Sequence, residues 1–516
     1  MTGVWPLVRL ALRRDRIMIP VWIAALVGMS ATSVLGTVGL YPDAASRIAA
    51  SAGINDVPSI VALYGRIYDP ASLGALSMIK MDGLGTAFVA ILGLLLVVRH
   101  TRAEEEAGRL ELIGAGVVGR HAALTAALIV AVGTSLVLGF VTALSLIACG
   151  LPAAGSFAFG AAWTGAGIAF AGIGALAAQL TRSPRSANAI GVVALGAVYL
   201  LRAIGDTRGP EWLSWLSPIG LSQQIRPFAG ERWWVFLILA GIAAVFSAGA
   251  YVLHGRRDLG TGLLPDRAGP AGAGVLLHGP LGLAWRLHRG SVLGWAAAFL
   301  VLGAVCGSIA QNIGSLVNTP QTQALFEALG GEQGLTNAFI AAELSIGGIV
   351  AAVYGIQGAM RLHSEETSLH MESLLATGVS RVRWALSHVT VVVLGCTALL
   401  VAMGLGASVT DGRMLLGAAL AQLPATLVLV GITVAAFGFV PRFSALGWAA
   451  LVAFVLVGEL GPLLRLSHWV MDLSPFTHLP KLPGGVVTAT PLVWLSVVAV
   501  AFAAAGLVAF RRRDMT

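Results

Sequence analysis

Charged residues are scarce in this chain of 516 residues. Asp, Glu, Lys and Arg make up 11% of it, whereas soluble domains carry about 25%. Long apolar runs take their place, since 57% of the residues are hydrophobic. This balance excludes a soluble globular protein and predicts an integral membrane protein. The cations stand at the ends of apolar runs, so the net charge of +8 does not indicate nucleic-acid binding.

Sites for redox, metal or nucleotide chemistry are also lacking. The three cysteines, Cys149, Cys306 and Cys396, all lie in apolar runs and fit neither a disulfide framework nor metal-ligand spacing. An ATP-binding phosphate loop needs GxxxxGK[ST], but the only lysines, Lys80 and Lys481, do not follow a glycine. No hydrolase arrangement stands out. The sequence therefore predicts no catalytic, cofactor-binding or metal site in this chain.

Twelve apolar runs are long enough to span a membrane, for which a helix needs about 20 apolar residues. They predict an all-α polytopic membrane protein. The expected spans lie near 17–39, 76–98, 122–149, 156–180, 187–204, 233–253, 291–313, 340–360, 387–409, 414–438, 444–461 and 491–510.

The chain also contains an internal repeat. The acidic loop 99–120, RHTRAEEEAGRLELIGAGVVGR, matches 360–381, MRLHSEETSLHMESLLATGVSR, without a gap. Each half holds six spans, so both halves enter the membrane with the same orientation and form parallel repeats. Further matches pair Leu216-Ser217-Pro218 with Leu473-Ser474-Pro475, and Arg256-Arg257-Asp258 with Arg512-Arg513-Asp514. We expect a first half at 1–259, a Gly/Pro-rich connector at 260–279 and a second half at 280–516.

The basic residues set the expected topology. Most of them fall at the N-terminus, at the C-terminus and in alternate loops, which the positive-inside rule places in the cytoplasm. Both termini and both acidic loops are therefore expected on the cytoplasmic side of a bacterial plasma membrane.

The acidic loops are the candidate docking surfaces. No proline interrupts them, and their composition favours helix, so Glu104 and Glu111 should share one face. We expect i,i+4 pairs between Arg102 and Glu106 and between Arg361 and Glu365. A solvated helix whose charges pair internally is the alternative. The docking residues predicted are Arg102, Glu104, Glu105, Glu106, Gly108, Arg109, Glu111, Glu365, Glu366 and Glu372.

Histidines in the second loop could suggest a metal site. However, His363 and His370 align with Arg102 and Arg109, and an arginine is not an ordinary metal ligand. We therefore interpret them as interchangeable cationic positions.

Two aligned pairs of ionisable residues lie at membrane depth, where such residues are costly and often functional. Asp82 aligns with Glu343, and Arg202 with Glu459. They are either interfacial residues that snorkel or part of a polar outer vestibule between the halves, and hence possible pathway residues.

The whole chain resembles the membrane subunits of type-2 ABC exporters, in the actinobacterial polyketide antibiotic (tetronasin-like) branch. The acidic segments, the Leu-Ser-Pro segments and the sequence GLLPDRAGP at 262–270 carry this resemblance. It implies elbow helices near 4–16 and 280–289, and outer hairpins at 209–232 and 462–490. The acidic loops would be coupling helices for a separate cytoplasmic ABC ATPase, expected in two copies, which holds ATP and Mg²⁺. Leu369 and His370 replace Gly108 and Arg109, so the two contacts should differ.

Together these features predict a permease that exports a hydrophobic or amphiphilic, antibiotic- or drug-like compound. Its partners would be the ATPase, membrane lipids and the small substrate, and it would not itself be an enzyme. Two alternatives remain. A proton- or ion-coupled secondary transporter would use Asp82, Glu343 and Glu459 as coupling carboxylates, and a membrane scaffold would only recruit partners through the acidic loops.

Overall fold

The protein is described here by a computed structural model, in which two compact units appear. One contains the described residues of Met1–Ala268, and the other those of Gly269–Val317 and Thr322–Thr516. The structure describes the chain except residues 1, 208, 259, 265–271, 273, 275, 276, 278, 312–330, 444, 461–466 and 514–516. It also leaves out the side chains of 113, 114, 331–333, 335, 442, 459, 460 and 468.

The expected all-helical class is confirmed. The described residues form helices and turns without a strand, and eleven helices are long and apolar enough to cross a membrane. The span expected at 444–461 is a shorter helix, α22 (Leu446–Leu460), of 15 residues. At 1.5 Å per residue it covers about 22 Å, less than the ~30 Å of a bilayer core. The described chain is thus a multi-pass membrane protein with eleven candidate spans.

The first unit is organised around α10 (Ala153–Leu180), which packs against the spanning helices α6, α9 and α14. Its sequence alternates glycine and alanine with a few aromatic residues, and such small residues let helix backbones approach closely. At Gly160, an added Cβ would collide with the carbonyl oxygen of Gly139 on α9. The unit's helices are α1 (Val4–Arg14), α2 (Met18–Leu40), α3 (Ala44–Asn55), α4 (Pro58–Tyr64), α5 (Leu73–Lys80), the π-helical turn η1 (Met81–Gly85), α6 (Thr86–His100), α7 (Arg102–Glu106), α8 (Arg109–Gly114), α9 (Ala122–Ala148), α10, α11 (Pro184–Thr207), α12 (Trp212–Trp215), α13 (Pro218–Gln224) and α14 (Trp234–Arg256).

In the second unit, α15 packs along α19, α21 packs along α24, and α17 contacts both α19 and α21. Trp384, Tyr354 and Phe437 are buried in its core. Its described elements are α15 (Pro280–Gln311), α17 (Gly331–Thr367), α18 (His370–Leu375), α19 (Arg381–Asp411), α20 (Leu416–Leu420), α21 (Leu423–Phe439), η4 (Pro441–Phe443), α22, α23 (His468–Met471), η5 (Pro475–His478) and α24 (Ala489–Arg512).

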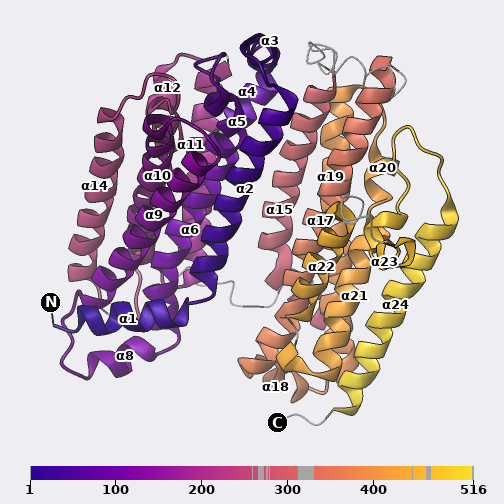
Figure 1. Cartoon of the computed structure of the whole chain (residues 1–516). Helices are drawn as coiled ribbons and strands as arrows, with labels where there is room; N and C mark the ends of the chain where they lie inside the picture. Colours follow the sequence, from indigo (N-terminus) through magenta and orange to yellow (C-terminus); the bar gives the residue numbers. More distant parts are fainter. Residues whose placement is uncertain are drawn as a thin grey trace. The chain divides into compact units, whose positions relative to one another are not determined.

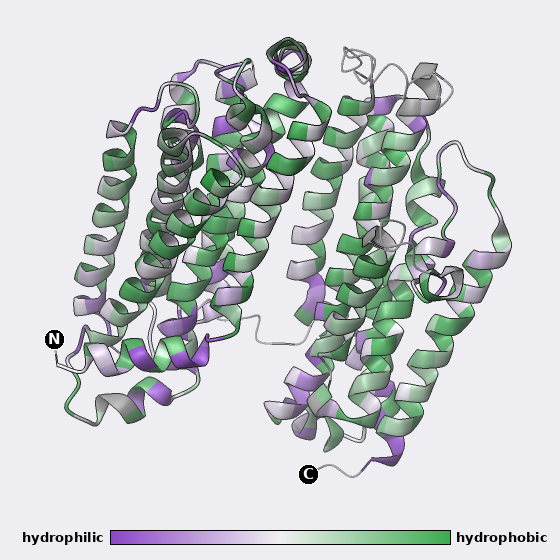
Figure 2. Ribbon diagram, in the orientation of Figure 1, coloured by the Kyte–Doolittle hydropathy of each residue, from purple (hydrophilic) through white to green (hydrophobic). Residues whose placement is uncertain are grey.

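Each unit has an acidic end, where its acidic loop lies, and an opposite end. In the first unit, α1 and α8 lie at the acidic end, and α3 and α12 lie at the opposite end (Figure 1). Hydrophilic residues concentrate near the ends of the helices, whereas the helix shafts are mostly hydrophobic (Figure 2).

The two predicted elbow helices differ. In the first unit, α1 is a separate amphipathic helix that ends before Asp15, whose buried carboxylate pairs with Arg99 and His100. In the second unit, the residues expected to form an elbow are instead the first turns of the continuous helix α15. His288 stands where the first unit has Asp15 and contacts His388, so this position lacks the carboxylate that anchors the first elbow.

Candidate functional site

The first acidic loop is a broken helix. The chain turns at Thr101 after α6, forms the short α7 and leaves helical geometry at Ala107 and Gly108, where φ of Gly108 is 70°. The predicted continuous helix is therefore wrong. A glycine adopts this left-handed conformation without steric cost, and it re-aims the chain into α8.

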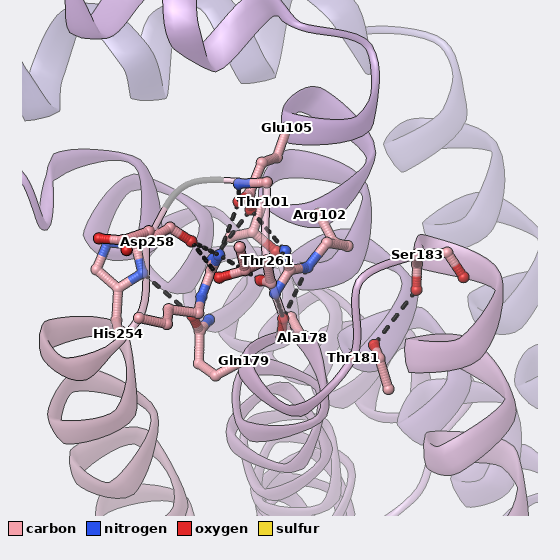
Figure 3. Close-up of polar contacts among 12 residues, drawn as sticks. Thr101, Arg102, Glu105, Ala178, Gln179, Thr181, Ser183, His254, Asp258 and Thr261 are labelled. Carbon is pink, nitrogen blue, oxygen red and sulfur yellow. Dashed lines mark hydrogen bonds and ion pairs between the residues drawn. The ribbon is translucent and has the colours of Figure 1, made fainter. Parts of the chain in front are cut away.

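Glu105 is the buried anchor of this loop. Its two oxygens accept bonds from the guanidinium of Arg257, at 2.7 and 2.9 Å, beyond the end of α14. The backbone N–H of Gly260 donates to the same carboxylate at 2.6 Å, and Arg102 lies 3.1 Å away. Figure 3 shows Glu105 among side chains from α7, α10 and the segment after α14. One carboxylate thus joins the acidic loop to the last helix of the unit.

Arg102 also turns inward, so its predicted pair with Glu106 is wrong. The side chain is 1% exposed and donates to the carbonyl of Ala178 at 2.8 Å and to that of Thr261 at 3.1 Å. The carbonyls near the C-terminus of α10 attract a cation because helix ends leave them without backbone partners. Arg102 therefore clamps the loop onto α10 (Figure 3).

Glu104 faces the elbow helix. It pairs with Arg14 of α1 and, at 2.7 Å, with Arg109 of α8. Burial lowers the pKa of Arg14 from its ordinary value, and the positive charges of Arg99 and Arg109 add to this effect. The outward-facing residues of the loop are Glu106, Glu111 and Leu112, whose side chain is 79% exposed.

The second unit repeats the anchor. Glu366, which aligns with Glu105, pairs with Arg513, which aligns with Arg257. Arg381 donates to the carbonyl of Arg513 at 2.7 Å, just as Arg120 donates to that of Arg257 at 3.1 Å. In both units, therefore, an arginine that follows the last helix pairs with the acidic loop.

Glu365, which aligns with Glu104, pairs with residues of its own segment. The predicted pair of Arg361 with Glu365 is confirmed at 3.2 Å, and His370 lies 3.3 Å from the same carboxylate. His370 thus occupies the place that Arg109 holds in the first unit. In the described part of the chain, no group of three His, Cys, Asp or Glu side chains could hold a metal ion.

Two replacements make the second loop different. His363 stands where Arg102 stands in the first unit, and neither its Nδ1 nor Oε2 of Glu366 has a partner among the described residues. Leu369 aligns with Gly108 and has the same left-handed backbone, with φ of 59°. A leucine in this left-handed conformation costs about 1–2 kcal/mol of folding free energy. Burial of the side chain does not offset this cost, because Leu369 is 64% exposed. Glu372, in α18, is exposed as well.

The membrane-depth residues lie apart from the acidic loops. Arg202 is buried within the first unit and donates to the carbonyl of Ala62 at 2.6 Å, which caps the C-terminal turn of α4. Its guanidinium also lies 3.6 Å from Asp206 and over the ring of Tyr199. Arg202 is thus a structural clamp and does not snorkel toward lipid.

The three other residues predicted at membrane depth differ in their surroundings. Asp82 lies in η1, and its Oδ1 is buried without a hydrogen-bond partner among the described residues. Glu343 lies on α17, 3.6 Å from the thiol of Cys306. The side chain of Glu459 lies outside the described residues.

Sequence reasoning missed the arginine partners of both anchors. Their signal was the repeated Arg-Arg-Asp at 256–258 and 512–514, which marks the ends of the two last helices. It also missed Asp206, although it follows Arg202 at i+4 on one helix face.

Comparison with known proteins identifies the family. The model described as "Multidrug efflux system permease Rv1217c, C-terminal domain" matches residues 7–254 and 277–511. The chain is also 42% identical over 526 aligned positions to the multidrug efflux system permease protein Rv1217c of Mycobacterium tuberculosis (strain ATCC 25618 / H37Rv). That alignment covers 100% of this chain and 95% of the relative. The chain therefore belongs to the family of multidrug efflux system permeases that this model describes.

Proposed function

We propose that the chain is the transmembrane subunit of an ATP-driven ABC exporter, and that two copies of a cytoplasmic ATPase dock on the two acidic ends. The observation that carries this proposal is the repeated anchor. Glu105 with Arg257, and Glu366 with Arg513, each tie an acidic loop to the last helix of a unit. A push on the loop would therefore pass directly into the helical bundle.

The exposed residues next to each anchor would form the contact. Glu106 and Glu111 offer two carboxylates beside the apolar side chain of Leu112. In the second unit, Glu372 offers one carboxylate beside Leu369. Protein interfaces typically combine an apolar centre with a charged rim that steers association. A basic surface around an apolar depression on the ATPase would complement both loops.

The ATPase would bring the chemistry. This chain lacks GxxxxGK[ST], so ATP and Mg²⁺ would bind the partner and not the permease. The positive-inside pattern supports a cytoplasmic location of both acidic ends and both termini. The cargo would be a hydrophobic or amphiphilic drug-like compound, and the relative is named for multidrug efflux. Assignment to the tetronasin-like branch remains a prediction, because the relative and the family model are both named for multidrug efflux.

Copurification tests the docking. Charge reversal by Glu106→Arg with Glu111→Arg changes exposed carboxylates without removing a described ion pair, so the permease should fold and yet lose its ATPase. Asp56→Arg, at an exposed residue that follows α3 on the opposite end and has no described ion pair, is the matched control and should retain it. Charge reversal at Glu105 would be a poor test, since it removes a buried anchor. Undiminished copurification and coupled ATPase activity in the double variant would overturn the proposal.

One observation supports a second candidate, an ion- or proton-coupled transporter. Oδ1 of Asp82 is buried without a partner, as expected for a carboxylate that binds and releases a proton. Vesicles distinguish the two candidates: transport that persists without ATP but collapses with an uncoupler would favour the second.

A further inference from the structure

An open cavity of about 500 Å³ lies at the opposite end of the second unit. One wall is α17, which presents Asn337, Ser345 and the small side chains of Ala338, Ala341 and Ala342. The other wall is the segment 481–485 before α24, which runs from Lys481 to two glycines. Gly484 has φ of 102°, a conformation that brings this segment against α17 beside Asn337.

The first unit closes the corresponding cavity. There, the segment before α14 approaches α5 and η1, and the remaining space is only about 20 Å³. Phe228 fills it, with its ring against Gly74 and Gly155. Counted from the shared Leu-Ser-Pro, the position of Phe228 is taken by Gly485 in the second unit. The second unit therefore lacks the aromatic side chain that fills this space in the first unit.

The charge around the open cavity has one sign. Its walls are mostly apolar. Among the described residues that line it, Lys481 is the one cation, and none is a carboxylate. Lys481 forms no ion pair with the described residues. The amide oxygen of Asn337 accepts from Arg413 at 2.7 Å, which leaves the amide NH₂ as a donor toward the cavity. An ammonium and an amide donor above an apolar wall match an anionic head group with a hydrocarbon tail.

We propose that this cavity binds an amphiphile with an anionic head group, with Lys481 and Asn337 holding the head and the alanine face of α17 holding the tail. The ligand is either a compound on its way out or an anionic membrane lipid. Only its identification as cargo rests on the proposed export function. Binding itself needs neither ATP nor the ATPase.

The rarity of lysine makes a sharp test possible. Lys80 and Lys481 are the only lysines. Mass spectrometry after treatment with an amine-acetylating reagent therefore measures the modification of Lys481 in the cavity and of Lys80, the internal control, in one sample. The full-length permease would be placed in nanodiscs of neutral phosphatidylcholine, with dodecanoate as the anionic probe. Acetylation of Lys481 should slow about tenfold once dodecanoate exceeds its dissociation constant ~10-fold, because the rate follows the free fraction. Lys80 should be unaffected, and dodecyltrimethylammonium should protect neither lysine.

A filled cavity is the second arm. Ala338→Phe with Ala342→Phe, at exposed positions of α17, should fill the cavity as Phe228 fills the corresponding space in the first unit. The double variant should therefore abolish the protection of Lys481. Ile346→Phe on the same helix, at a position that does not line the cavity, should retain it. Equal protection of both lysines, equal protection by the cationic amphiphile, or protection that survives the double variant would overturn the proposal.

The source of the ligand is a third arm. Nanodiscs that contain phosphatidylglycerol, without added dodecanoate, should protect Lys481 if membrane lipid is the occupant. Protection by dodecanoate alone would assign the cavity to a free compound. Because the ATPase is absent throughout, a failed docking test would leave these results standing, and the reverse also holds.

Discussion

Glu105 and Arg257, which are 152 residues apart, form a two-bond ion pair with N–O distances of 2.7 and 2.9 Å. Both side chains are buried, and the pair joins the first acidic loop to the residue that follows α14. Glu366 and Arg513 make the corresponding pair in the second unit. The anchors on which the proposed function depends therefore join residues that are far apart in the sequence.

The first prediction concerns the energetic coupling of this pair. Glu105→Gln and Arg257→Gln should each lower the stability by up to about 3 kcal/mol, because each removes the two-bond partner of a buried charge, while Arg102 stays beside residue 105. The double variant should cost clearly less than the sum of the two. Thermal unfolding followed by tryptophan fluorescence measures all three. Additive losses would show that the two residues act independently.

The second prediction concerns the weaker anchor. His363→Arg places a guanidinium where Arg102 stands in the first unit and offers a donor to Oε2 of Glu366, which has no described partner. The thermal midpoint should rise, by an amount equivalent to about 1 kcal/mol. The reciprocal change, Arg102→His, should lower it. A fall in both variants would contradict the equivalence of the two positions.

The third prediction separates stability from docking at Leu369. Leu369→Gly relieves the left-handed backbone and should stabilise the permease by about 1 kcal/mol. It should also weaken ATPase binding, since the exposed side chain is lost. Gly108→Ala is the comparison, because open space surrounds Gly108 and only the backbone cost applies. Calorimetry and an ATPase binding assay report the two effects, and unchanged ATPase affinity in Leu369→Gly would remove Leu369 from the contact.

The fourth prediction concerns pH. Tyr68 lies in the segment between α4 and α5. Burial there raises its pKa to about 12, because the neutral phenol is favoured over the charged phenolate away from water. The unfolded side chain titrates near ~10, so the stability that Tyr68 contributes is complete below pH ~10 and is lost as the pH rises toward ~12. Tyr68→Phe should show a shallower fall in thermal midpoint across this range. Parallel curves for the two proteins would exclude the role of Tyr68.

Local reasoning worked where the residues involved are neighbours on one helix. The pair of Arg361 with Glu365 was predicted from i,i+4 spacing and is observed, because α17 continues unbroken through both residues. The same rule failed for Arg102 and Glu106. There, the carbonyls of Ala178 and Thr261, far away in the chain, offered the guanidinium buried acceptors that Glu106 could not match.

The membrane-depth residues show the same limit. Their positions could be read from the alignment of the halves, but the clamp of Arg202 on the end of α4 could not, since it depends on where α4 folds back. The contrast between Phe228 and Gly485 was likewise present in the sequence and acquired meaning only when the cavities were seen.

By itself, the sequence determined that this is an all-helical membrane protein, that its acidic loops recur, and that it lacks a phosphate loop, because composition, periodicity and motif spacing are properties of the chain alone. The tertiary structure decided which acidic residues are anchors and which are exposed. It also decided that one unit keeps an open cavity where the other is filled. These outcomes depend on burial and on partners brought together from distant segments, and the free energy of a buried charge depends on those partners more than on its neighbours in sequence.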